Sequence, residues 1–278
     1  MKIMPISGAL GAKVSDIDLS QKLSTNDSAI IYRDFLKYKV LFFENQLLSP
    51  KQFVSFAKVI GCPSIYPFIK GLQDAPEVIE IIKTKEDKKN FGGSWHSDTS
   101  YMDKPDMATL LYAKHVPYYG GDTLFANTAL AYDQLSSGMK ELLSGLSGIN
   151  SSEKSYVGGR AAGMNQLDAM KHTFDSSVPT YISEHPIVRR HPETGLKSLY
   201  LNLSHTIKFK DMKVEESIPL INYLCAHMVK PEFTCRFRWS RGAMAIWDNR
   251  TTLHHAVNDY PNQKRHMQRI TIAGDRPC

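Results

Sequence analysis

Cysteine is scarce in this sequence, and the few that occur are scattered. Among 278 residues there are four, Cys62, Cys225, Cys235 and Cys278, with none of the short paired spacings that mark zinc knuckles or disulfide frameworks. Free thiols in a reducing compartment are the simplest interpretation. The N-terminus also lacks a long apolar core followed by a small-residue cleavage site, so we expect a cytoplasmic protein.

Long hydrophobic runs and clustered positive charge are absent as well. No apolar stretch approaches the ~20 residues that a membrane-spanning helix requires, which argues against a membrane protein. The net charge is +6, yet the densest basic stretch, residues 83–89 (KTKEDKK), is interrupted by Glu86 and Asp87 and indicates a solvated loop. We therefore expect no nucleic-acid partner, whereas a basic surface would attract anionic small molecules.

What the sequence does contain is an ordinary globular composition without repeats or linkers. Apolar residues make up 42% and charged residues 22%, so a single domain over residues 1–278 is expected. Ser49 and Pro50 supply an N-cap and a first-turn proline for a helix that ends near Gly61. The remaining apolar periodicity predicts helices at residues 28–38, 129–146 and 214–229, and strands at 39–45, 108–116 and 123–127.

Four short β-type segments follow one another in the last fifty residues. They span residues 232–239, 243–248, 251–257 and 267–275, and turn-forming residues separate them. Consecutive short strands at this spacing predict an antiparallel meander. With helices outside them, they favour a mostly β fold with flanking helices, a jelly-roll barrel of the double-stranded β-helix, cupin-like type.

The stretch GGSWHSDTSY, residues 92–101, places His96 and Asp98 two positions apart. On a strand, side chains at i and i+2 project from the same face, so both could bind one ion. Chance makes such a triplet common in a chain with ten histidines, so alone it is a weak signal. His254, in WDNRTTLHHAV, lies on a late strand that a barrel could bring across, and its neighbour His255 would face the other way.

The ligand types leave the metal open. Two histidines and one carboxylate form the facial triad of non-haem Fe(II) oxygenases, but the same groups also bind zinc. In the strand KRHMQRITIAGD, Arg265 and Arg269 share one face. Guanidinium groups match carboxylates bidentately, so two of them facing a barrel interior would require an anion. Solvent exposure of both is the alternative.

Together these motifs resemble the taurine dioxygenase family of Fe(II)- and 2-oxoglutarate-dependent oxygenases. The likeness covers nearly the whole chain and keeps the motifs in order: GALGAKVSDIDLS, WHSDTSY, GGDTLFAN, HPIVRRHPETG, WDNRTTLHHAVNDY and RHMQRITIAGD. The resemblance implies that His96, Asp98 and His254 hold Fe(II). It also implies that Thr123 and Arg265 bind the distal carboxylate of the co-substrate 2-oxoglutarate.

On the substrate side the resemblance is less complete. Arg269 resembles the family residue that reaches the anionic group of the primary substrate and lies near the metal-bound end of 2-oxoglutarate. Tyr66 replaces a family histidine, Gly92 an asparagine and His205 a phenylalanine, which argues against taurine as substrate. Candidates for the substrate pocket, besides Arg269, are Tyr66, the backbone N–H beside Thr99, Tyr156, Arg160 and His205.

The implied activity is hydroxylation of a C–H bond in a small anionic organic substrate. O2 is consumed, and 2-oxoglutarate is converted to succinate and CO2. Two alternatives stay open: a zinc-dependent hydrolase or isomerase on the same barrel, and a non-catalytic small-molecule-binding protein. The resemblance further implies a homo-oligomer, dimer or tetramer. A lid-like insertion is expected at about residues 151–185, because irregular stretches of that length are usually functional.

Overall fold

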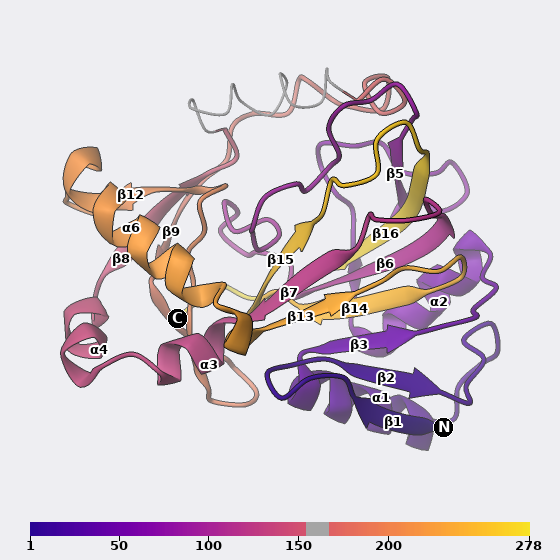
Figure 1. Cartoon of the computed structure of the whole chain (residues 1–278), viewed down its shortest axis with the longest axis horizontal. Coiled ribbons are helices and arrows are strands. Elements are labelled where there is room, and N and C mark those ends of the chain that lie inside the picture. Colours follow the sequence, from indigo (N-terminus) through magenta and orange to yellow (C-terminus); the bar gives the residue numbers. More distant parts are fainter. Residues whose placement is uncertain (154–166) are drawn as a thin grey trace.

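Two β-sheets face each other in the computed structural model, which describes residues 1–153 and 167–278 (Figure 1). The larger sheet has the strand order β1 (Lys2–Pro5), β2 (Ala12–Ser15), β3 (Val40–Phe43), β14 (Met244–Asp248), β6 (Ala108–His115), β16 (Arg265–Ile272) and β4 (Pro63–Ser64), with β5 (Ile79–Lys83) paired to β16. The smaller sheet has the order β13 (Thr234–Phe237), β7 (Thr123–Asn127) and β15 (Thr252–Ala256).

Helices α1 (Thr25–Tyr38) and α2 (Pro50–Ile60) cover the outer face of the larger sheet. Ser49 forms a capping box at the start of α2, and a proline occupies the first turn, as the sequence predicts. Phe35 and Phe53 from the two helices are fully buried in the core that they form with the sheet. The larger sheet is therefore shielded from solvent on this side.

Side-chain alternation along the strands divides the core into two layers. On β14, Met244 and Ile246 pack toward α1 and α2, whereas Ala245 and Trp247 point into the space between the sheets. There the Trp247 ring meets Phe125 of the smaller sheet, with ring centroids 5.5 Å apart. This inner apolar layer joins the two sheets.

A third layer covers the other face of the smaller sheet. It contains α3 (Thr128–Asp133), α4 (Ser137–Leu143) and α6 (Val214–Met228), and its apolar core includes Ala126 and Leu253. The helical stretch expected at residues 129–146 is thus two short helices. The other elements are β8 (Ser147–Ser151), β9 (Ile182–Pro186), β10 (Val188–Arg190), β11 (Lys197–Leu199), β12 (Thr206–Phe209) and the 3-10 helix η2 (Pro231–Phe233).

The meander expected for the last four strands is wrong, although the mostly β jelly-roll fold is confirmed. β13 and β15 both pair with β7 in the smaller sheet, whereas β14 and β16 both pair with β6 in the larger one. Consecutive strands therefore alternate between the sheets, which is the jelly-roll pattern. As a result, side chains of β15 and β16 can face each other across the space between the sheets.

The expected lid-like insertion joins two paired strands. It leaves from β8 and returns through β9, which pairs with β8 along its whole length. Residues 154–166 of this segment lie outside the described part of the chain. In the described part, no helix has the length and apolarity needed to span a membrane.

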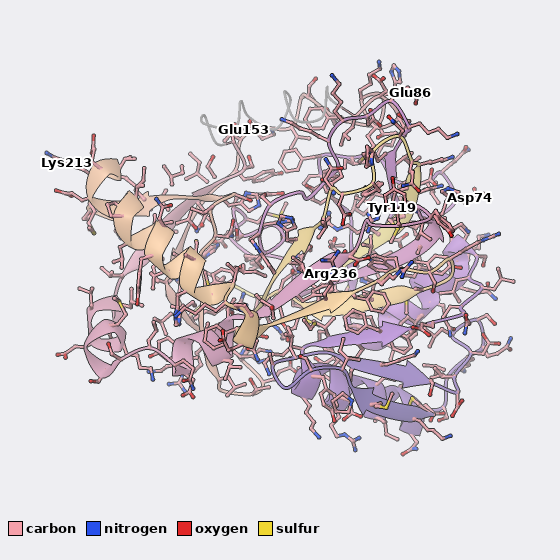
Figure 2. All side chains as sticks on the ribbon, in the orientation of Figure 1. Asp74, Glu86, Tyr119, Glu153, Lys213 and Arg236 are labelled. Carbon is pink, nitrogen blue, oxygen red and sulfur yellow. The ribbon has the colours of Figure 1, made fainter. Side chains whose placement is uncertain are left out.

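Charged side chains lie mainly at the periphery, as the labelled Asp74, Glu86 and Lys213 show (Figure 2). Residues 83–89 follow this pattern only in part. Lys85, Lys88 and Lys89 are exposed. Lys83 and Asp87 are buried. The expected solvated loop therefore begins at Thr84, because β5 extends as far as Lys83, and Asp87 is the one buried residue within it.

Candidate active site

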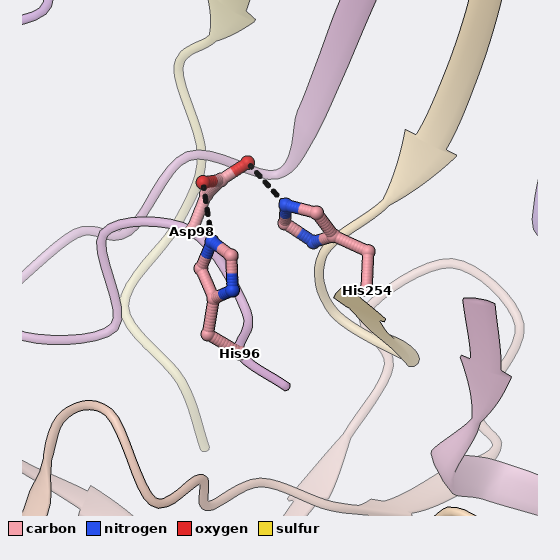
Figure 3. Close-up of side chains that lie close together, drawn as sticks. All are labelled: His96, Asp98 and His254. Atoms are coloured by element: carbon pink, nitrogen blue, oxygen red, sulfur yellow. Dashed lines mark ion pairs between the residues drawn. The ribbon is translucent and has the colours of Figure 1, made fainter. Parts of the chain in front are cut away.

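Three expected metal ligands converge beside β15 (Figure 3). His96 and His254 form an isolated antiparallel bridge, with N···O distances of 3.0 and 2.8 Å. Asp98 follows at the start of a turn, so a bridge and a turn replace the strand expected for the His-x-Asp pair. The ligand atoms of all three side chains nevertheless lie within 4.8 Å of one another, in the one such cluster found among the described residues.

The orientation of the imidazoles suits a shared ion. His96 Nε2 lies 3.8 Å from Asp98 Oδ1, and His254 Nε2 lies 3.9 Å from Asp98 Oδ2. His96 Nδ1 lies 2.7 Å from the carbonyl oxygen of Ser94, so it carries the proton and donates, leaving the Nε2 lone pair free. Burial lowers the pKa of both imidazoles, which are therefore neutral at physiological pH, the form that binds metals.

Asp98 supplies the negative charge of the cluster. Its Oδ2 accepts a hydrogen bond of 2.7 Å from Thr109, and Arg269 Nη2 lies 2.8 Å from its Oδ1. Burial acts to raise the pKa of this carboxyl, but the nearby positive charge of Arg269, together with the hydrogen bond from Thr109, outweighs it and holds the pKa well below its usual range. An ionised carboxylate with two neutral imidazoles is a donor set that fits Fe(II).

Asn249 connects Asp98 to the turn after β14. Its Nδ2 donates to the Thr109 hydroxyl at 3.0 Å, and its Oδ1 accepts from Trp247 Nε1 at 3.0 Å. Its backbone carbonyl accepts a hydrogen bond of 2.7 Å from Ser97. Its Oδ1 also accepts from the backbone N–H of Asp98 at 3.4 Å, so Asn249 orients Asp98 both directly and through Thr109. The motifs single out neither Asn249 nor Thr109 as a site residue; the one available signal is that Asn249 stands in the WDNR stretch ahead of His254.

Replacement of Asn249 by alanine tests this positioning role. We expect Fe(II) to bind Asn249→Ala about tenfold to a hundredfold more weakly, because groups that orient metal ligands typically have effects of that size. Anaerobic titration with Fe(II) measures the change. Asn258→Ala is the matched control, since Asn258 is exposed and donates to the backbone carbonyl of Lys88, away from the triad. Equal Fe(II) affinity in both variants would contradict the role.

A pocket beside the triad contains the residues expected to bind the co-substrate. It is lined in part by Thr123, Arg265 and Arg269 together with the three expected ligands. Arg265 is only 5% exposed, and its Nε and Nη2 have no hydrogen-bond partner among residues 1–153 and 167–278. Its guanidinium lies 5.7 Å from the Trp239 ring centroid, and Trp239 Nε1 donates to the Thr123 hydroxyl at 2.9 Å. A buried guanidinium without partners is unfavourable, so this end of the pocket fits a carboxylate.

A second pocket adjoins the first and shares Arg269 with it. Tyr66, Thr99 and His205 also line it, so four expected substrate-pocket residues meet there. The Arg269 guanidinium lies 5.0 Å from the Tyr66 ring centroid. The Thr99 hydroxyl donates to the carboxylate of Asp106 at 3.1 Å, and its carbonyl accepts from the Met102 N–H at 2.8 Å, so the backbone N–H is the group that Thr99 can offer a substrate. Tyr156 and Arg160 lie outside the described residues.

Gly92 explains one departure from the taurine-site pattern. Its φ is +76°, a conformation that glycine adopts freely and asparagine adopts at some cost. A Cβ atom at this position would lie 3.3 Å from His96 Cε1. Glycine therefore leaves space directly beside the first expected metal ligand, in the wall that both pockets share.

Comparisons with known proteins agree with this arrangement. The family model described as "Taurine catabolism dioxygenase TauD, TfdA family" matches residues 2–271. An alkylsulfatase from Acinetobacter baylyi is 35% identical over 278 residues, covering 99% of this chain and 86% of the relative. An alpha-ketoglutarate-dependent sulfate ester dioxygenase from Pseudomonas putida is 33% identical over 280 residues, covering 100% of this chain and 91% of the relative.

A solved structure extends the agreement to the fold. The crystal structure of a taurine dioxygenase from Burkholderia xenovorans superposes with a TM-score of 0.82 at 32% identity, covering 99% of this chain and 92% of that one. Sequence and fold thus agree over the full length, and the resemblance seen in the motifs is confirmed. The chain belongs to the TauD/TfdA family and is a 2-oxoglutarate-dependent dioxygenase that uses Fe(II) and O2.

Proposed function

We propose that this dioxygenase hydroxylates a small alkyl sulfate ester at the carbon that bears the ester oxygen. The observation that carries the proposal is Arg269, a guanidinium only 3% exposed that borders both pockets beside the triad. Its planar fork of donors matches the oxygens of a sulfate group. The alkylsulfatase and the sulfate ester dioxygenase that resemble this chain almost from end to end favour a sulfate ester over a sulfonate.

The site residues take separate roles in this proposal. His96, Asp98 and His254 would hold Fe(II), and Thr123 with Arg265 would receive the distal carboxylate of 2-oxoglutarate. When bound, Fe(II), 2-oxoglutarate and O2 supply the oxidative hydroxylation, with 2-oxoglutarate leaving as succinate and CO2. Because the three ligands contribute a single negative charge, a divalent ion there keeps positive charge that attracts the dianionic co-substrate.

Arg269 would hold the sulfate while the second pocket receives the alkyl chain. The contact of its Nη2 with Asp98 lacks hydrogen-bond geometry, so this nitrogen keeps a donor for an incoming oxygen. The Tyr66 ring covers one side of the guanidinium and restricts its orientation. Phe91 and Tyr101 provide apolar wall for a short chain. A sulfate fixed at Arg269 would therefore present its nearest carbon to the triad.

Hydroxylation at that carbon would lead to cleavage of the ester. The product carries a hydroxyl and a sulfate on one carbon, so the C–O bond to sulfate breaks as the hydroxyl becomes a carbonyl and its proton leaves with the sulfate. One sulfate ester, one O2 and one 2-oxoglutarate thus give one aldehyde, one hydrogen sulfate, one succinate and one CO2. No water is consumed in this balance.

An activity screen tests the proposal directly. Purified protein with Fe(II), ascorbate and 2-oxoglutarate is offered alkyl sulfates, alkanesulfonates, phosphonates and carboxylates, and succinate, sulfate and aldehyde are measured. We expect equal amounts of all three products from a short alkyl sulfate. A zinc hydrolase would release alcohol and sulfate without succinate, and a non-catalytic binding protein would release nothing. Faster turnover of a sulfonate or carboxylate than of every sulfate ester would refute the substrate class.

Assembly and location belong to the same proposal. Residues 1–278 would form one domain with a lid at about 151–185, and the protein would be a cytoplasmic homo-dimer or homo-tetramer without nucleic-acid or membrane partners. The four cysteines are free thiols, in keeping with a reducing compartment. Light scattering should give a particle mass of two or four times 31.4 kDa, and a mass of one chain would refute the oligomer.

A further inference from the structure

Lys83 ends β5 with its side chain turned toward the inside of the molecule. The buried positions of β5 alternate, at Ile79, Ile81 and Lys83. Ile81 lines the same pocket as Arg265. In the strand register, Lys83 lies directly opposite Arg265 on β16. Two cationic side chains are therefore cross-strand neighbours on the inner face of the larger sheet.

The burial of Lys83 is not explained by any hydrogen bond. The residue is 4% exposed, and its Nζ has no hydrogen-bond partner in the described part of the chain. Asp87 is a nearby carboxylate, but its oxygens accept from the backbone N–H of Thr84 at 2.7 Å and of Asp168 at 2.9 Å. A buried ammonium without a hydrogen bond is unfavourable unless an anion joins it.

The aromatic surroundings place Lys83 and Arg265 around one region. Lys83 Nζ lies 4.7 Å from the ring centroid of Tyr260, a cation–π distance. Tyr260 is 1% exposed, and burial raises the pKa of its hydroxyl, an effect that the nearby positive charge of Arg265 opposes. On its other side Arg265 lies against Trp239, whose indole nitrogen donates to Thr123. Tyr260 thus lies near both cations: Arg265 lines the pocket at its Thr123 end, and Lys83 lies behind Arg265, next to the Tyr260 ring.

We propose that Lys83 is a second cationic residue for the carboxylate that Arg265 and Thr123 receive. The proposal rests on the placement of the distal carboxylate of 2-oxoglutarate at Arg265. The other nearby carboxylate, Asp122, is engaged by Arg236, whose Nε lies 2.6 Å from it, so within the described residues neither acid forms a direct ion pair with either buried cation. A ligand carboxylate compensates both, and the flexible stem of lysine lets its ammonium turn from the Tyr260 ring toward the anion.

Two ligands of equal length separate this role from a structural one. 2-Oxoglutarate ends in a carboxylate, whereas 2-oxopentanoate ends in a methyl group at the same position. We expect Lys83→Met to weaken the binding of 2-oxoglutarate about tenfold and to leave the binding of 2-oxopentanoate unchanged, because only the charged end faces the lysine. Anaerobic titration of the Fe(II)-loaded protein, followed by visible absorption of the chelate, gives both dissociation constants without turnover.

Matched variants make the outcome decisive. Lys85→Met removes an exposed lysine two residues away and should bind both ligands like the wild type. Lys83→Arg keeps the charge and should retain most of the 2-oxoglutarate affinity, while Lys83→Gln, a second neutral variant, should show the same selective loss as Lys83→Met. Unchanged 2-oxoglutarate binding in the neutral variants, or equal weakening of both ligands, would overturn the role of Lys83.

The result is independent of the primary substrate. No sulfate ester is present in the titration, so a failure to turn over sulfate esters would leave the role of Lys83 untouched. Conversely, wild-type protein that binds 2-oxoglutarate no better than 2-oxopentanoate would refute the placement of the distal carboxylate at Arg265, and the role of Lys83 with it.

Discussion

Replacement of Asp98 by alanine is expected to lower turnover by about three orders of magnitude or more, since a metal centre that loses one of three protein ligands no longer fixes the ion. Asp98 is the only anion of the triad, so the two neutral imidazoles would be left to hold a dication alone. The change also removes the carboxylate that lies 2.8 Å from the buried Arg269 guanidinium, so more of the positive charge of Arg269 is left uncompensated beside the metal. Both effects weaken Fe(II) binding.

Fe(II) titration and succinate release measure the two consequences separately. Asp103→Ala is the matched control, because Asp103 lies in the same turn region but is exposed and pairs with the exposed Arg276 at 3.3 Å. The control should keep wild-type iron affinity and turnover. A non-catalytic binding protein would bind its ligand equally well with Asp98 replaced, so retained iron binding and unchanged ligand affinity in Asp98→Ala would refute the catalytic role.

Local chemistry made much of the framework predictable. A serine followed by a proline defines a helix start through two independent backbone effects, and α2 begins there with a full capping box. Short runs of apolar residues likewise identify strands such as β3 and β6, which are buried along most of their length. These signals depend only on residues close together in the chain.

Strand pairing was not predictable in the same way. The residues of β13 to β16 do not indicate which sheet each strand joins. Their short connections are compatible with a meander within one sheet and also with strands that alternate between two sheets. The partners β6 and β7 lie more than a hundred residues earlier, so the choice depends on long-range packing. Trp247, for example, is placed by its contact with Phe125, which no local pattern reveals.

The expected site residues and their supporting groups differ in the same respect. His96, Asp98 and His254 could be identified in the sequence because metal binding restricts the types and spacing of ligand residues. The structure brings the three side chains together. Thr109 and Asn249 act through hydrogen bonds that exist only after β6 and β14 have paired. Lys83 was hidden for a further reason: it begins a charged stretch whose other lysines are exposed, and only the register with β16 turns it inward.

Replacement of Arg265 by methionine should raise the KM for 2-oxoglutarate about a hundredfold. Methionine fills most of the volume against Trp239 but offers no donor, so the distal carboxylate would enter a buried site with one anchoring group fewer. Charge-assisted hydrogen bonds contribute roughly 1.5–3 kcal/mol each, which corresponds to a factor of about ten to a hundred and fifty. Arg265→Lys keeps the charge but loses the fork, so an intermediate KM is expected.

The pattern across both substrates identifies what Arg265 binds. Because its guanidinium lies at the Thr123 end of the first pocket and not in the second, the KM for the sulfate ester should change little in Arg265→Met, whereas Arg269→Met should raise that KM strongly. Arg238→Met is the control, since Arg238 is exposed immediately before Trp239 and should keep wild-type kinetics. Steady-state rates with each substrate varied in turn give these values. If Arg265→Met raised the KM for the sulfate ester more than the KM for 2-oxoglutarate, the proposed roles of the two arginines would have to be exchanged. The reason is that each guanidinium can anchor only the anion that reaches its own end of the pocket.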